Sequence, residues 1–209
     1  VGPRVEDERQ LFRQIAIMNS DGSGLRKITD SPYFKSNPSF SLDGKRIIYA
    51  RANSRVEGTK KPVTNFDIYE VDIKTGHERQ LTNFRFYAVT APFYLPDGKH
   101  FIFAGEASRG DGKTAADFQR YRKQYEDRYL ENIIFIMNGE NDELRPTFTN
   151  GDFSSFPHIS LNGSDVLFVS RTNQMDGIVG KFNFDLFMRV AGVNKRLTRL
   201  ESKIYDITL

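Results

Sequence analysis

A hairpin signature occurs four times in this chain and constrains its fold more than any other feature. The copies cover residues 15–29, 68–82, 134–147 and 186–198, and each has two short β-prone runs around a turn rich in Gly, Asp or Asn. A second signature follows the first three copies and turns at Asp-Gly or Asn-Gly. The distance from the start of a copy to that Asp or Asn is 28, 29 and 28 positions (15 to 43, 68 to 97, 134 to 162). A period held this closely indicates a repeat architecture.

The repeat predicts a four-stranded antiparallel unit. Asp-Gly and Asn-Gly favour tight hairpin turns because Gly adopts positive φ angles at little cost. Two successive hairpins place the strands of the first unit at 38–42, 46–51, 67–72 and 78–81. Such a sheet has apolar residues on both faces and must stack against neighbours. Radial stacking makes a β-propeller, so the sequence predicts an all-β propeller of four-stranded antiparallel blades.

The copies predict one partial propeller over residues 1–209. Complete blades are expected at about 36–82, 87–149 and 153–198, with partial blades at 9–29 and 202–209. Propellers have about four to eight blades, so three blades and two fragments do not close a ring. We expect the chain to be a segment of a larger propeller, or to be completed by another chain. The alternative is a curved open stack with unusual caps.

Composition and motifs exclude several classes of function. There is no cysteine, which rules out disulfides and thiolate metal sites. The net charge of +3 does not call for nucleic acid, and the apolar run 133–137 is too short to insert in a membrane. The three histidines have no ligand spacing, and no hydrolase elbow, zinc-protease motif or phosphate loop occurs. We therefore expect no catalytic residues, no metal and no cofactor, and we expect that the protein is not an enzyme.

The sequence resembles a known repeat family. The pairing of IYEVDIKTGHERQLT with PFYLPDGKHFIFA is similar to the TolB-type β-propeller repeat, a WD40-like unit, over roughly residues 9–209. The family usually has Trp three residues before the turn Asp, where this chain has Phe40, Tyr94 and Ile159. We expect these side chains to fill the space between blades instead.

The resemblance implies a function as well as a fold. It implies a non-enzymatic scaffold that binds protein partners within a larger complex, in the periplasm or cell envelope of a bacterium. The same repeat occurs in propeller domains of prolyl-oligopeptidase relatives. The alternative is therefore a propeller that gates a serine peptidase domain outside this segment. A sugar-processing propeller is a weaker option, because it needs metal-binding histidine clusters that the sequence lacks.

All the long insertions fall between the second and third strands of a blade. They cover residues 52–66, 106–131 and 172–183, and in an up-and-down blade they emerge at one end, which we call the long-loop end. The other connections emerge at the opposite end, the tight-turn end. Because long loops on a rigid scaffold commonly carry function, we expect protein partners at the long-loop end.

The middle insertion predicts a helix at about 113–131. Aromatic residues recur there at helical spacing, and Tyr and Arg are frequent at interface hot spots. The candidate partner-binding residues are Phe118, Tyr121, Arg122, Tyr125 and Tyr129. The alternative is that these aromatic side chains pin the helix onto the propeller.

One position of the innermost strand is a candidate for lining a central channel. Ser39, Phe93 and His158 occupy it in the three blades, each four residues before the turn Asp or Asn. A Ser and a His near a channel could bind a ligand. The alternative is that all three side chains fill gaps between blades.

Overall fold

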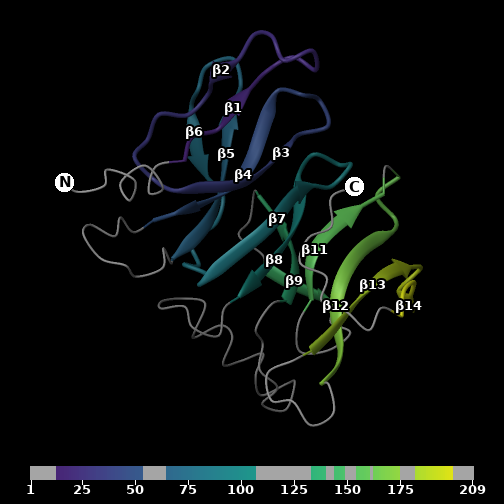
Figure 1. Cartoon of the computed structure of the whole chain (residues 1–209). Helices are drawn as coiled ribbons and strands as arrows, with labels where there is room; N and C mark the ends of the chain where they lie inside the picture. The colour runs from purple at the N-terminus through teal and green to yellow at the C-terminus, as the bar shows by residue number, and fades with distance from the viewer. Residues whose placement is uncertain are drawn as a thin grey trace, which may run out of the picture.

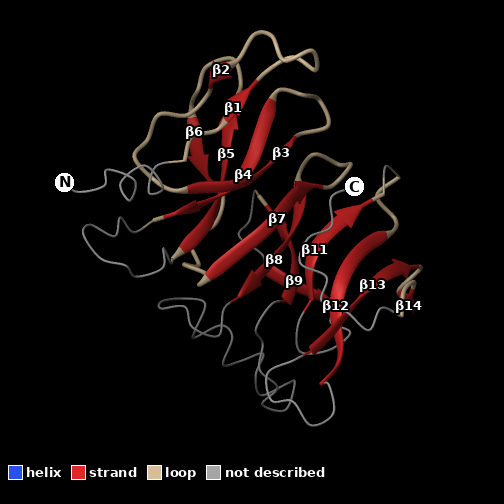
Figure 2. Cartoon of the chain, viewed as in Figure 1, coloured by secondary structure: helices blue, strands red, loops and turns tan. Residues whose placement is uncertain are grey.

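The computed structural model consists of β-sheets stacked side by side (Figure 1). It describes residues 13–53, 65–106, 133–139, 144–148, 154–160, 162–174 and 182–199. These residues form strands joined by turns and loops and contain no helix (Figure 2). The strands are β1 (Ala16–Ile17), β2 (Arg26–Lys27), β3 (Lys35–Phe40), β4 (Arg46–Ala52), β5 (Phe66–Asp72), β6 (Glu78–Gln80), β7 (Ala88–Tyr94), β8 (His100–Glu106), β9 (Ile133–Asn138), β10 (Leu144–Phe148), β11 (Ser154–Ile159), β12 (Val166–Gln174), β13 (Phe182–Val190) and β14 (Val193–Arg196).

The described strands make three antiparallel sheets of four and one of two. Each larger sheet is a simple meander in chain order, β3 to β6, β7 to β10 and β11 to β14, while among the described strands β1 pairs only with β2. We call the larger sheets the first, second and third blades. This arrangement confirms the predicted class of four-stranded antiparallel blades.

Alternation along the central strands builds the contacts between sheets. On β4, Ile47 and Tyr49 face the β1–β2 hairpin, whereas Ile48 and Ala50 face the second blade. On β8 the same period of two sends Phe103 toward the first blade and Ile102 toward the third. The first and second blades therefore each bury both faces.

A bulge recurs in the innermost strand of every blade. The ladder shifts register between Ser36 and Ser39, between Thr90 and Phe93, and between Ser155 and His158. In each blade a proline follows the first bulge residue, and the residue before this proline has positive φ: Asn37 (52°), Ala91 (47°) and Phe156 (50°). Proline lacks a backbone N–H and is tolerated within sheets at bulges. The bulge lets β3 begin at Lys35, three residues before the predicted start at Pro38.

The predicted tight turns form with the expected chemistry. Gly44, Gly98 and Gly163 have φ of 66°, 67° and 73°. The Oδ1 atom of the preceding Asp or Asn accepts a hydrogen bond from the backbone N–H two residues later, at 3.1, 2.9 and 3.1 Å. Side chain and glycine together specify these turns.

One of the three residues expected between blades is exposed. Tyr94 is buried between the first and second blades, and Ile159 packs between the second and third. Phe40 is 59% exposed, so the expectation is wrong for this residue. Phe40 pairs with Ile47, which faces the β1–β2 hairpin. On that side the described residues form only β1 and β2, which correspond to the third and fourth strands of a blade. No strand equivalent to β3 therefore covers Phe40.

Several expectations lie outside the described residues. They are the helix at 113–131 with Phe118, Tyr121, Arg122, Tyr125 and Tyr129, and the partial blade at 202–209. In the part of the chain that the structure describes, no helix is long and apolar enough to span a membrane.

Candidate functional site

The candidate channel residues lie on neighbouring inner strands. β7 lies between β3 and β11, and Ser39, Phe93 and His158 follow the bulge in each. The rings of Phe93 and His158 are in contact, with centroids 4.7 Å apart. All three side chains are partly buried, and burial lowers the pKa of His158. A neutral imidazole packed on a phenyl ring matches the gap-filling alternative more closely than a ligand-binding residue.

A Thr–carboxylate clamp closes the outer hairpin of the first blade. Thr82 Oγ1 donates to Asp67 Oδ1 at 2.7 Å and accepts from the backbone N–H of Ile68 at 2.9 Å. The same Asp67 oxygen accepts from the N–H groups of Phe84 and Arg85. Burial raises the pKa of the fully buried Asp67 carboxyl, and the hydrogen bonds from Thr82 and the backbone oppose that rise.

The clamp repeats along the chain. In the third blade Thr198 Oγ1 donates to Asp185 at 3.0 Å and accepts from Leu186 N. In the β1–β2 hairpin Thr29 Oγ1 accepts from Ile15 N and donates to Gln14, which stands where the first and third blades have Asp. In the sequence the signal is a polar residue, Gln14, Asp67 or Asp185, directly before three of the four hairpin copies and the Thr that ends each of them. The pair was not among the predicted site residues.

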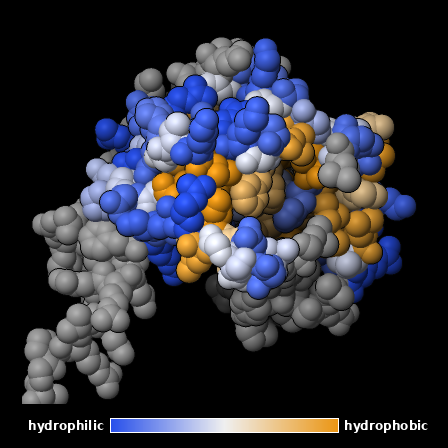
Figure 3. All heavy atoms as spheres, turned by 90° about the horizontal axis from the view of Figure 1, so that it is seen from above, coloured by the Kyte–Doolittle hydropathy of each residue, from blue (hydrophilic) through white to orange (hydrophobic). Residues whose placement is uncertain are grey.

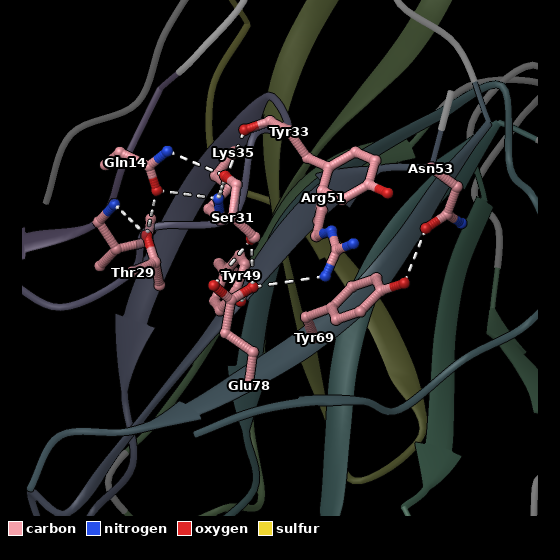
Figure 4. A network of polar contacts seen from close by, with 11 residues as sticks. Gln14, Thr29, Ser31, Tyr33, Lys35, Tyr49, Arg51, Asn53, Tyr69 and Glu78 are labelled. Atoms are coloured by element: carbon pink, nitrogen blue, oxygen red, sulfur yellow. Dashed lines mark hydrogen bonds and ion pairs between the residues drawn. The ribbon is translucent and has the colours of Figure 1, made fainter. Parts of the chain in front are cut away.

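A polar network attaches the β1–β2 hairpin to the first blade (Figure 4). Its centre is Lys35, which is 1% exposed. The Lys35 Nζ donates to Gln14 Oε1 at 3.0 Å, to the carbonyl of Ser31 at 2.7 Å and to that of Tyr33 at 3.4 Å. Because these three acceptors are neutral, burial is only partly offset and lowers the pKa of Lys35 to about 8.

Glu78 and Arg51 form the second half of the network. Glu78 accepts hydrogen bonds from Ser31 at 2.8 Å, from the Tyr49 hydroxyl at 2.9 Å and from Arg51 at 3.4 Å. The Arg51 guanidinium lies between the rings of Tyr33 and Tyr69, 3.9 and 4.2 Å from their centroids (Figure 4). Each of these residues contacts others of the same chain, so we interpret the network as scaffold.

The tight-turn end exposes apolar side chains. Five large ones lie in its turns or directly beside them: Met18 (65% exposed), Leu25 (73%), Leu42 (63%), Val190 (39%) and Val193 (69%). Turns usually carry small polar residues, so this placement is unusual. Blades cover one another by their faces, and a further blade would not cover residues in a turn. Figure 3 views the molecule from this end and shows apolar atoms bordering a hollow.

The described residues offer no evident metal centre. No group of three or more His, Asp or Glu side chains within them could hold a metal ion.

The fold is that of known β-propellers. The chain is similar to TolB from Acinetobacter baumannii (TM-score 0.61, 21% identity, covering 88% of this chain and 37% of that one). It is similar to a putative TolB from Agrobacterium tumefaciens (TM-score 0.57, 20% identity, 88% and 55%). It is also similar to the acylaminoacyl peptidase of Pyrococcus horikoshii (TM-score 0.52, 18% identity, 88% and 28%). No protein-family model and no curated protein matches the sequence.

These likenesses show a TolB-like propeller fold that is not TolB itself. The chain spans about a third to a half of the two TolB structures.

Proposed function

We propose that this TolB-like propeller is a non-enzymatic module that binds protein partners. The observation that carries the proposal is the set of apolar side chains in the turns of the tight-turn end. Exposed apolar surface that no part of the fold covers commonly marks an interaction site. Its burial by a partner stabilises a complex by about 25 cal/mol per Å².

The tight-turn end is not the end that the sequence favoured. The insertions at the long-loop end, with the predicted helix at 113–131, remain a second proposed contact surface. Two surfaces at opposite ends suit a scaffold that holds a larger complex together. A periplasmic or cell-envelope location is part of the proposal and rests on the resemblance to TolB.

A second candidate function is a propeller domain that gates a serine peptidase. The observation in its favour is the structural likeness to an acylaminoacyl peptidase, which is a likeness of fold. A serine hydrolase domain in a longer parent sequence would establish this alternative. Its absence from a complete parent sequence would exclude it.

Site-specific photo-crosslinking tests the proposed interaction surface. A photoreactive phenylalanine analogue replaces Leu42 at the tight-turn end, and the matched control replaces the exposed Asn83, in the segment that follows β6. In the native host we expect a discrete crosslinked partner from position 42, and its loss when Leu25 is also changed to Ser. Equal crosslinking from both positions, or none from position 42, would contradict the assignment.

A further inference from the structure

A small cationic pocket lies between the first and second blades at the tight-turn end. Its walls include Arg46 of β4, Arg79 of β6, Tyr94 of β7 and Lys99 of the turn before β8, and its volume is about 60 Å³. Residues from two blades meet here only because the blades stack. None of them was predicted to be a site residue, although Tyr94 was expected to lie between blades.

The two arginines are held in place by one buried carboxylate. Glu70 is 7% exposed and accepts from Arg46 at 3.2 Å and from Arg79 at 2.7 Å. The Tyr94 hydroxyl donates to the same carboxylate, and the Arg46 guanidinium lies 4.9 Å from the centroid of the Tyr94 ring. Burial and the adjacent Glu70 raise the pKa of Tyr94, so this hydroxyl stays protonated and continues to donate.

The charges at the pocket do not balance. In the ion-paired group of Glu70 and the two arginines, Glu70 supplies one negative charge, whereas Arg46 and Arg79 supply two positive charges. Each guanidinium has five N–H donors, and Glu70 occupies only part of each set. Arg46 and Arg79 both line the pocket, and their side chains are 30% and 54% exposed. A preorganised fork of this kind suits a planar anion.

The size of the pocket limits the ligand. One water needs about 10–15 Å³ by this measure, so about 60 Å³ accepts a group of a few heavy atoms. Pockets for metabolites and cofactors usually measure about 300–1,000 Å³. The pocket therefore suits a single charged group at the end of a side chain better than a free metabolite.

We propose that this pocket binds the carboxylate of one Asp or Glu side chain from the protein partner that docks at the tight-turn end. The inference rests on the proposed function, because the exposed Leu42 belongs to the turn directly before Arg46 on the same end. A partner segment with an acidic residue beside apolar residues would satisfy both features. The carboxylate would complete the charge balance that Glu70 begins.

NMR with a small probe tests the pocket without the partner. The arginine Nε–Hε signals are followed during titration with N-acetyl-aspartate amide, and the neutral N-acetyl-asparagine amide is the matched ligand control. We expect saturable shifts of the Arg46 and Arg79 signals with the aspartate probe alone. Arg79→Gln should weaken binding about tenfold, because one charge-assisted contact is lost. Lys45→Gln, which removes an exposed charge beside Arg46, should leave the affinity within about twofold, as expected for a solvated surface charge.

The outcomes separate this inference from the proposed function. Equal effects of Lys45→Gln and Arg79→Gln would show general charge attraction and overturn the pocket. Binding of inorganic sulfate at least about tenfold tighter than the aspartate probe would overturn the carboxylate assignment. If Leu42 gives no crosslink while the probe binds, the proposed function fails and the pocket stands. If Leu42 crosslinks while the probe does not bind, the pocket fails alone.

Discussion

Thr82 and Asp67 join the ends of the outer hairpin of the first blade through a buried hydrogen bond of 2.7 Å. The Thr82 hydroxyl accepts from Ile68 N at the same time, so a single side chain ties one strand to the carboxylate of the other. The same geometry recurs at Thr198 and Asp185. Three of the four hairpin copies end in a Thr that contacts the residue before its hairpin: Thr29, Thr82 and Thr198.

Removing the Thr82 hydroxyl should destabilise the fold. Thr82→Val leaves the N–H of Ile68 without its acceptor and removes one of the hydrogen bonds to the buried Asp67 carboxylate, which costs about 1–3 kcal/mol. Thr82→Ser keeps the hydroxyl and should recover most of that loss. Urea unfolding followed by circular dichroism measures both variants. A loss for Ser with little or no loss for Val would show that the methyl group, and not the clamp, carries the stability.

Stability should rise with pH above about 8 because of Lys35. Its pKa is lowered to about 8 in the folded protein and returns to its ordinary, higher value on unfolding. Between these values the unfolded chain binds more protons, so the free energy of unfolding increases with pH, by up to about 3 kcal/mol in total. Below about pH 8 Lys35 is protonated in both the folded and the unfolded state, so its contribution to the free energy of unfolding no longer changes with pH.

The matched variant for this prediction is Lys35→Met. It should lack the increase between about pH 7.5 and 9.5 and keep the rest of the pH profile. The range ends there because the raised pKa of Tyr69 acts in the opposite direction at higher pH. Parallel profiles for the two proteins would contradict a buried Lys35 that is charged at neutral pH.

The stacked guanidinium of Arg51 should not be replaceable by Lys. Arg51→Lys keeps the charge near Glu78 but loses the planar contact with the rings of Tyr33 and Tyr69. We expect a loss of about 1–2 kcal/mol in the free energy of unfolding. Arg85→Lys, at an exposed position after β6, is the control and should change stability by less than about 0.5 kcal/mol. Similar losses for the two variants would remove stacking as the cause.

The contact between the turns of the second and third blades should be measurable by comparing the stabilities of alanine variants at two glycines. A Cβ added at Gly163 would lie 2.6 Å from Pro96 Cγ, whereas one added at Gly44 meets nothing within 4 Å. Both glycines have positive φ, so both alanine variants share the backbone penalty of about 1 kcal/mol. Gly163→Ala should cost about 1–3 kcal/mol more, because the turn of the second blade is displaced. In a double-mutant cycle, adding Pro96→Ala should remove this additional loss of stability.

Much of the fold was predictable from the sequence because its determinants are local. The Asp-Gly turns follow from the φ angles that glycine permits, and the strands follow from alternation with a period of two. The prediction was wrong for Phe40, since exposure depends on which strands a neighbour contributes and not on the residue itself. The three-residue displacement of β3 has a similar origin, because a bulge at Asn37 continues the ladder past Pro38.

The candidate sites were much less predictable. Ser39, Phe93 and His158 were placed at one register position by counting, and the structure agrees with that register. Whether they bind or only pack depends on their neighbours, and Phe93 packs on His158. The exposed apolar residues in the turns were not predicted, because the sequence does not distinguish a Leu in a turn from a Leu at the end of a strand.

The sequence by itself determined the repeat, its period and the antiparallel sheet that each unit forms. Only the tertiary structure decided where the charges meet. Lys35 reaches Gln14 and Arg46 joins Arg79 on Glu70 because separate strands converge, and no spacing in the chain encodes that convergence. Local turns and alternation depend on a few adjacent residues, whereas burial and charge balance depend on the stacking of whole blades.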